Sequence, residues 1–145
     1  MPTDLGARFD STYTGKPAHI SPEDLLIFDR WWPTVREHIT EVYFDVGLGP
    51  GRPSPAGTPA NYAKMWLRLN QKRADILAVV RDEVWIIELR FAANTNALGR
   101  LLGYKGAYLE DPKLGANVRL MLVTNEYDAD VERAALYAGI IYTLA

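Results

Sequence analysis

The chain has 145 residues, 48% hydrophobic and 23% charged, a balance typical of one soluble globular domain that excludes a disordered chain. With no cysteine and only two histidines, disulfide bonds and a Cys/His zinc site are excluded. Because the sequence has no long apolar run, we expect no secretion signal and no membrane-spanning helix. The formal net charge of -2 argues against nonspecific coating of nucleic acid but leaves room for a local basic groove.

The first twenty residues predict an extended arm. They are polar and contain Gly6, Gly15 and Pro17, which interrupt regular structure. The remaining residues, 21–145, are expected to form a single domain.

A helix is predicted to begin after Ser21. Ser21 can cap the helix, Pro22 suits its first position, and acidic residues fill the first turn. Pro33 is the expected end, with a second short helix beginning at that proline as the alternative.

A half-buried strand is predicted from 38 to 48. Alternation places one set of side chains on one face (Thr40, Val42, Phe44, Val46, Leu48) and another set on the opposite face (Glu41, Tyr43, Asp45). Residues 47–60 follow with closely spaced glycines and prolines around Arg52 and predict a mobile loop, either a flap over substrate or a segment ordered by a partner.

Residues 62–72 are interpreted as a further extended segment. Period-two spacing would place Lys64, Trp66, Arg68 and Lys72 on one face. Interleaved basic and aromatic side chains are used by nucleic-acid grooves, so these four residues are candidates for substrate binding. The competing interpretation is the solvated face of an edge strand.

Residues 74–80 and 84–89 predict a β-hairpin with a charged turn. A two-residue loop at Asp82 and Glu83, or a four-residue loop at 81–84, would pair Val80 with Trp85. Either loop has an even length.

An even loop places Asp75, Glu88 and Arg90 on one face, with Asp75 opposite Arg90 and Leu77 opposite Glu88. Both carboxylates could then reach one cation, and a divalent metal would explain two acids on a mostly apolar face. The alternative is an ion pair between Arg90 and the carboxylates. An odd loop would move Asp75 to the other face.

The rest of the chain alternates helices and strands. A helix capped by Asn94, Thr95 or Asn96 is expected to end before Pro112, followed by a strand at 118–124, a helix at 128–138 with Gly139 beyond its end, and a strand at 140–144. This order predicts a mixed α/β domain.

Three segments together resemble the PD-(D/E)XK nuclease pattern. They contain Asp75 on one strand, Glu88 and Arg90 on the next, and Arg100 and Tyr104 on the following helix. The resemblance covers residues 73–145 and implies a restriction-endonuclease-like αβββαβ core, with a mixed central sheet flanked by helices and a C-terminal helix and strand.

The resemblance also implies roles for individual residues. Asp75 and Glu88 would bind Mg²⁺ or Mn²⁺, with the Leu89 carbonyl as a third ligand. Arg100 and Tyr104 would face the site and contact a phosphate or the nucleophile. Glu23 or Glu37 is the candidate for an additional carboxylate from the N-terminal region.

Two residues depart from the family pattern. Arg90 stands where the motif has Lys, and Arg100 where it often has Gln. Arginine stays protonated and cannot act as a general base, so Arg90 could only position the phosphate or neutralise negative charge. Water activation would then come from the metal or from Lys105 or Lys72.

These departures leave two functions open. One is a metal-dependent DNA phosphodiesterase in which arginines hold the phosphate. The other is an inactive nuclease-like module, for instance in a viral or mobile-element assembly, in which arginines replace the metal. DNA is the expected partner, with protein partners or a homo-oligomer formed through the arm as further options. The expected location is cytoplasmic, or virion-associated for a viral component.

Overall fold

The computed structural model describes residues 3–17 and 19–145, apart from the side chain of Arg68. Parts of the expected arm, at 1–2 and 18, therefore lie outside the described residues. The elements in chain order are α1 (Pro22–Val35), the 3₁₀ helix η1 (Arg36–His38), β1 (Glu41–Leu48), α2 (Ala60–Asn70), β2 (Lys72–Val80), β3 (Glu83–Arg90), α3 (Thr95–Leu109), β4 (Val118–Thr124), α4 (Ala129–Ala138) and β5 (Ile140–Leu144).

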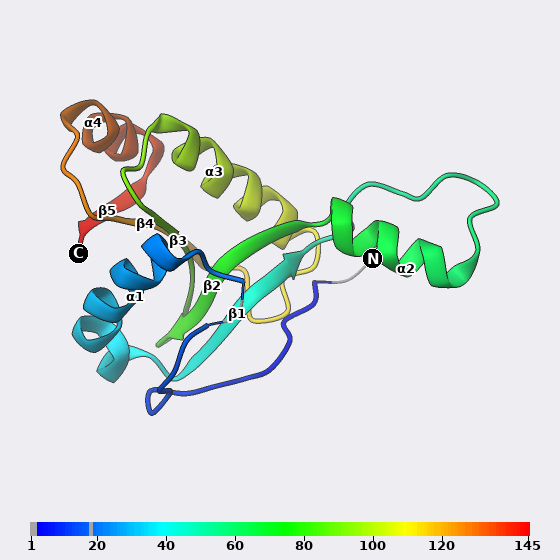
Figure 1. Ribbon diagram of the computed structural model, residues 1–145, viewed down its shortest axis with the longest axis horizontal. Coiled ribbons are helices and arrows are strands. Elements are labelled where there is room, and N and C mark those ends of the chain that lie inside the picture. Colours follow the sequence, from blue (N-terminus) through cyan, green and yellow to red (C-terminus); the bar gives the residue numbers. More distant parts are fainter. Residues whose placement is uncertain (1–2, 18) are drawn as a thin grey trace.

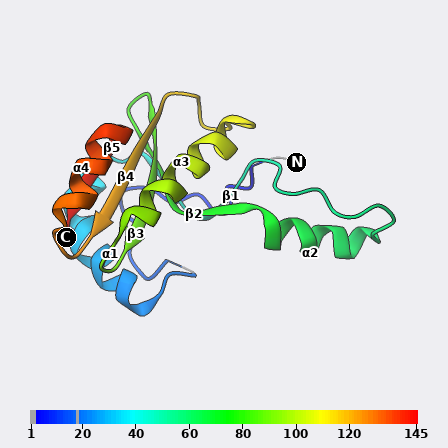
Figure 2. The same cartoon turned by 90° about the horizontal axis from the view of Figure 1, so that it is seen from above.

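A five-stranded mixed sheet forms the centre of the fold, in the order β1-β2-β3-β4-β5. The first three strands are antiparallel, and β4 and β5 continue in parallel from β3. Helix α1 covers one face, while α3 and α4 cover the other (Figures 1 and 2). The predicted mixed α/β class is confirmed, and the order of elements is consistent with a restriction-endonuclease-like fold.

Each face of the sheet has its own apolar core. Residues of α3 and α4 pack on one face, where Leu101 and Tyr108 are fully buried. On the other face α1 contributes Phe28, Trp31 and Trp32, whose rings contact one another. The strands are therefore fixed from both sides, which restrains any side chain placed between them.

Helix α1 begins as predicted but does not end at Pro33. The Ser21 hydroxyl accepts a hydrogen bond from the Asp24 N–H at 3.2 Å, and the helix continues through Pro33 to Val35. Pro33 has no backbone N–H, so the carbonyl of Asp29, one turn earlier, loses its helical hydrogen bond. Both residues are exposed, so water can bind that carbonyl.

Strand β1 changes face at Asp45, contrary to the predicted alternation. Val42 packs in the core under α1, whereas Val46 and Leu48 pack in the core under α3. Asp45 has φ 51°, a left-handed conformation that rotates the following residues.

The β2–β3 hairpin has an even loop as predicted, but its turn comes one residue earlier. Val80 pairs with Glu83, leaving Arg81 and Asp82 as the two turn residues. Arg81 has φ 58°, the positive value that the first residue of such a tight turn adopts. The predicted pairing of Val80 with Trp85 is therefore wrong. The predicted positions of Asp75 opposite Arg90 and of Leu77 opposite Glu88 are wrong for the same reason, since Leu77 pairs with Ile86. The faces are unchanged because the loop stays even.

Residues 62–72 are not an extended segment, which corrects that prediction. Helix α2 occupies 60–70 and β2 begins at Lys72. Lys64 and Trp66 are two residues apart on a helix and therefore point in roughly opposite directions. The predicted stripe of Lys64, Trp66, Arg68 and Lys72 does not exist as one face, and the side chain of Arg68 is not described.

The arm runs along the free edge of β1. Asp4 and Phe9 form antiparallel bridges to Gly47 and Val42. Thr3 is fully buried, and its hydroxyl accepts a hydrogen bond from the Gly49 N–H at 3.1 Å. The arm thus covers an edge that would otherwise expose unpaired backbone groups.

The C-terminal half follows the predicted elements closely. Asn94 caps α3, Asp128 caps α4, and Gly139 ends α4 with φ 71°. The two parallel connections through α3 and α4 place both helices on the same face of the sheet. Among the described residues, no helix is long and apolar enough to cross a lipid bilayer.

Candidate functional site

Asp75 and Glu88 meet where β2 and β3 approach their shared end. The ladder pairs Ile76 with Ile87, and one further step along it brings Asp75 beside Glu88. Glu88 is only 3% exposed and Asp75 is half-buried. The hairpin therefore places two carboxyl groups against each other with little access to water.

Hydrogen bonds stabilise one member of this pair, Asp75. The Glu88 carboxyl donates to Asp75, and the Leu89 N–H donates to Asp75 Oδ2 at 3.0 Å. Glu88 Oε2 is buried and accepts no hydrogen bond from the described residues. An unpaired buried oxygen carries a desolvation cost that a bound cation would relieve.

Burial and proximity disturb the acidity of both groups. Burial, together with the nearby charge of Asp75, raises the pKa of Glu88 to about 8. Burial also raises the pKa of Asp75, while the Leu89 N–H bond opposes that shift. The pair favours sharing a proton over carrying two negative charges near neutral pH.

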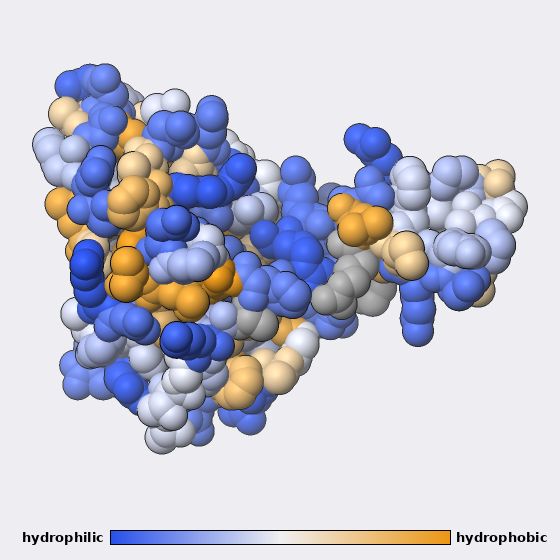
Figure 3. Space-filling model, viewed as in Figure 1, coloured by the Kyte–Doolittle hydropathy of each residue, from blue (hydrophilic) through white to orange (hydrophobic). Residues whose placement is uncertain are grey.

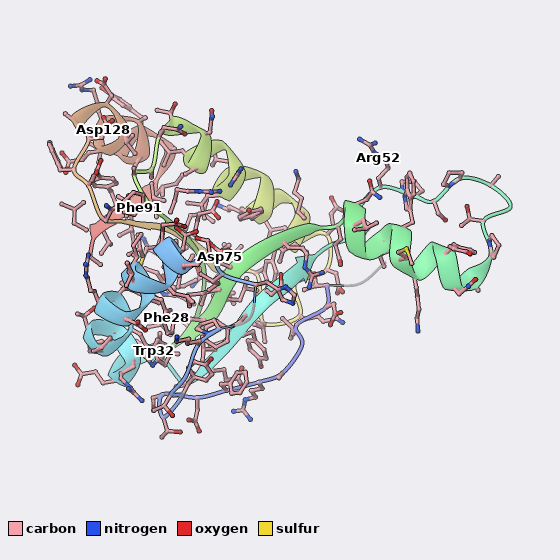
Figure 4. All side chains as sticks on the ribbon, in the orientation of Figure 1. Phe28, Trp32, Arg52, Asp75, Phe91 and Asp128 are labelled. Carbon is pink, nitrogen blue, oxygen red and sulfur yellow. The ribbon has the colours of Figure 1, made fainter. Side chains whose placement is uncertain are left out.

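A third carboxylate, Asp24, lies close enough to raise the pKa of both groups. It sits in the first turn of α1, whose N-terminal end lies beside Asp75 (Figure 4), and its Oδ1 accepts the Phe91 N–H at 2.8 Å. Sequence reasoning considered Glu23 and Glu37 and missed Asp24. Glu37 instead pairs with His38 at an exposed position.

No cation of the described chain closes the pair. Arg90 lowers the pKa of both carboxyl groups through its charge, yet no ion pair joins Asp75 or Glu88 to any described side chain. Arg100 is exposed on α3. The space between the carboxylates is therefore not filled by a direct arginine contact.

Tyr104 faces the carboxylate pair from α3. It is half-buried, and its pKa is raised by burial and then by the charges of Glu88 and Asp75. The phenol therefore stays protonated at ordinary pH and can only donate a hydrogen bond or accept one as a neutral group.

The predicted substrate-binding residues divide between two places. Lys72 begins β2 and lies over α3, where a Cβ on Gly103 would come within 3.6 Å of its Nζ. Lys64 is exposed on α2, and Trp66 donates its indole N–H to the Arg52 carbonyl at 3.1 Å. Trp66 thus fastens the Gly/Pro loop to α2.

The carboxylate pair fits a hard divalent cation. Within the described residues no three His, Cys, Asp or Glu side chains converge as a metal cluster, so side chains would supply two ligands at most. Mg²⁺ commonly binds through one or two carboxylates and takes its remaining ligands from water and phosphate oxygens. The Leu89 carbonyl remains a predicted third protein ligand.

Comparisons with known proteins assign no family. No family model matches this chain, and no curated protein matches it. Among solved structures it is similar to the crystal structure of a repair endonuclease from Pyrococcus abyssi, with a TM-score of 0.46 and 18% identity over 90% of this chain. The chain spans 49% of that endonuclease chain.

Proposed function

We propose that this protein is a metal-dependent phosphodiesterase that cleaves DNA, with Asp75 and Glu88 holding Mg²⁺ or Mn²⁺. The observation that carries the proposal is the close pair of the buried Glu88 and the half-buried Asp75, in which Glu88 Oε2 accepts no hydrogen bond and neither carboxyl group forms an ion pair with a described residue. Burying two acids together costs free energy, and a divalent cation bound by Asp75 and Glu88 would offset that cost and would act as a Lewis acid toward a phosphate.

Arg90 positions the phosphate in this proposal. Its charge acts on both carboxyl groups, but among the described residues it forms an ion pair with neither, so its guanidinium is available to a phosphate. Arginine binds phosphate through two parallel hydrogen bonds and keeps its proton. Arg90 therefore neutralises the charge of the phosphate and orients it, and the exposed Arg100 is a second candidate for the same task.

Tyr104 supplies a hydrogen bond. Its raised pKa keeps the hydroxyl protonated, which suits donation to a phosphate oxygen and excludes a role as general base. When bound, the cation would lower the pKa of water and offset negative charge at the phosphate. Lys72 and Lys105 remain the proposed alternatives for proton removal.

One observation favours a competing function, an inactive nuclease-like module that binds DNA or protein. Arg90 occupies the motif position at which a lysine could exchange a proton, and arginine cannot replace it in that task. The absence of an ion pair between Arg90 and the carboxylates counts against the version in which arginine substitutes for the metal.

A cleavage assay separates these functions. Single-stranded DNA, duplex DNA and RNA are incubated with Mg²⁺ or Mn²⁺ and with wild type, Asp75→Asn or Glu88→Gln. Each substitution should lower the cleavage rate by about 100-fold or more, because several kcal/mol of transition-state stabilisation are lost with the cation.

Asp82→Asn is the matched control. Asp82 is an exposed acid in the turn of the same hairpin, so this variant removes one negative charge without touching the pair. It should cleave like wild type. Equal cleavage by wild type and Glu88→Gln, or none by wild type with either metal, would contradict the proposal.

A further inference from the structure

Residues 49–71, which we name the projection, extend away from the body of the domain. They comprise the Gly/Pro loop and α2, and both views show them standing clear of the sheet and its other helices (Figures 1 and 2). On the face drawn in Figure 3 the projection is mostly hydrophilic or intermediate, with a small apolar patch near its junction with the domain. Its position requires an explanation, because α2 buries little apolar surface.

The projection and its attachment contain no negative charge. The 29 residues between Asp45 and Asp75 include five Lys or Arg and no Asp or Glu, although the whole chain has 18 acidic residues and a net charge of -2. Arg52 points outward from the projection (Figure 4). A cationic segment on an acidic protein indicates a local partner of negative charge.

The base of the projection is fastened to the domain. Gln71 donates its side-chain N–H to the Gly49 carbonyl at 2.6 Å, and the Thr3 hydroxyl accepts the Gly49 N–H. Gly49 has φ 64° and lies so close to the Ala107 carbonyl that a Cβ there would overlap it. A residue with a side chain does not fit at position 49. The first residues of the loop therefore pack closely against the C-terminal part of α3.

A groove opens at this base. It is a cavity of about 630 Å³ lined by three cations, Lys64, Arg73 and Lys113, and by one acid, Asp4. The three cations come from α2, from β2 and from the connection after α3, which lie far apart in the sequence. Arg73 also pairs with Asp45 at 2.9 Å, so Lys64 and Lys113 are the cations without an ion pair among the described residues.

One of the residues that line the groove, Arg73, lies on the same strand as Asp75 of the carboxylate pair. Arg73 and Asp75 are two residues apart on β2, which is about 7 Å in an extended strand. Consecutive phosphates of one strand of duplex DNA rise about 3.4 Å along its axis, so a bound backbone could pass from the groove to the pair within a few nucleotides.

We propose that the projection and the groove at its base bind the phosphate backbone of a nucleic acid and guide it toward Asp75 and Glu88. This inference rests on the proposed function for the chemistry at that pair. Three cations, Lys64, Arg73 and Lys113, line the groove against one acid, Asp4, and this excess of positive charge favours a polyanion over a protein partner. Tyr62, 58% exposed on α2, gives a ring on which a base can stack.

The test is a binding measurement without cleavage. Fluorescence anisotropy of labelled single-stranded and duplex DNA is recorded in EDTA at several salt concentrations, for wild type and for Lys64→Glu/Lys113→Glu. The double variant should bind at least about tenfold more weakly, and the slope of log K against log salt should become shallower by about 1.4 to 1.8. Both lysines are exposed, and circular dichroism verifies folding.

The matched control is Arg30→Glu/Arg133→Glu. It changes the net charge by the same amount at exposed positions on α1 and α4. This control should keep wild-type affinity within about twofold. If both double variants lost DNA affinity equally, the loss would be an effect of net charge alone and the inference would be wrong. Undetectable DNA binding by wild type would also overturn it.

Two further outcomes are separable. If Lys64→Glu/Lys113→Glu binds DNA like wild type while Tyr62→Ser/Leu69→Ser alters the oligomeric state in size-exclusion chromatography, the projection is a protein-binding surface and the inference is wrong. If Glu88→Gln cleaves like wild type, the proposed catalytic pair fails, but the binding comparison in EDTA still decides the role of the projection.

Discussion

Strand β2 carries charged residues in opposite environments at two places. Asp75 lies against a buried Glu88, between two packed layers, where the ionisation of each group depends on the other. Three residues earlier, Lys72 begins β2 directly after the projection and its side chain is exposed. Burial makes a charge costly and specific, whereas exposure makes it inexpensive, additive and sensitive to salt.

The largest expected difference between these regions is in stability. Ile87, beside Glu88, is 1% exposed, whereas Leu69 in the projection is 76% exposed. Ile87→Ala should lower the free energy of unfolding by about 2 to 5 kcal/mol, because it leaves a cavity in the core under α1. Leu69→Ala should change it by less than about 0.5 kcal/mol in urea titrations. Similar losses for both would show that α2 is packed more tightly than its exposure indicates.

The second difference is a pH dependence of stability. The pKa of Glu88 is raised to about 8 in the folded chain from its ordinary value of 4.5, so the folded state binds more protons between these two pH values. Stability from this group is therefore full at low pH and is lost as pH rises toward and through 8. Melting temperatures without metal should fall across this window in wild type, and Glu88→Gln should remove much of the fall. Parallel curves for both proteins would contradict the shift.

A smaller effect is expected from Arg90. Its charge lowers the pKa of Glu88, so Arg90→Gln should raise that pKa and move the acidic limb of the cleavage profile upward by about half a pH unit to one unit. Arg90→Lys keeps the charge and should keep the limb in place. The measurement is cleavage rate against pH, and an unchanged limb in Arg90→Gln would exclude electrostatic coupling.

The smallest effect belongs to a single exposed cation of the projection. Arg52→Gln removes one positive charge far from the core, so DNA affinity should fall only severalfold at moderate salt and the salt slope should become shallower by about 0.7 to 0.9. Salt-titrated anisotropy measures both. A loss as large as that from the Lys64/Lys113 variant would mean that the charges do not act independently.

Much of the fold was predictable because local signals and topology agree. The cap at Ser21, and a cap among Asn94, Thr95 and Asn96, follow from short polar side chains before apolar runs. Asp128, predicted as the first residue of its helix, is instead the cap of α4. An even hairpin loop was sufficient to place Asp75 and Glu88 on one face, even though the predicted turn was one residue late.

Other features depend on signals that the sequence carries weakly. Helix α2 has no capping side chain, and its apolar residues Met65, Leu67 and Leu69 alternate with other residues as they would in a strand. Its Ala, Lys, Met and Leu content is the signal that favoured a helix. The left-handed Asp45 and the approach of Asp24 to the site arise from tertiary packing, which local pattern does not encode.

The most direct test of the central claim is Mn²⁺ binding measured by isothermal titration calorimetry on wild type, Asp75→Asn, Glu88→Gln and the Asp82→Asn control. Wild type and the control should bind one Mn²⁺ per chain, more tightly at pH 8 than at pH 6 because Glu88 must lose its proton. Both variants of the pair should lose this binding. Undiminished binding in Glu88→Gln, or no binding by wild type at pH 8, would contradict a metal site at Asp75 and Glu88.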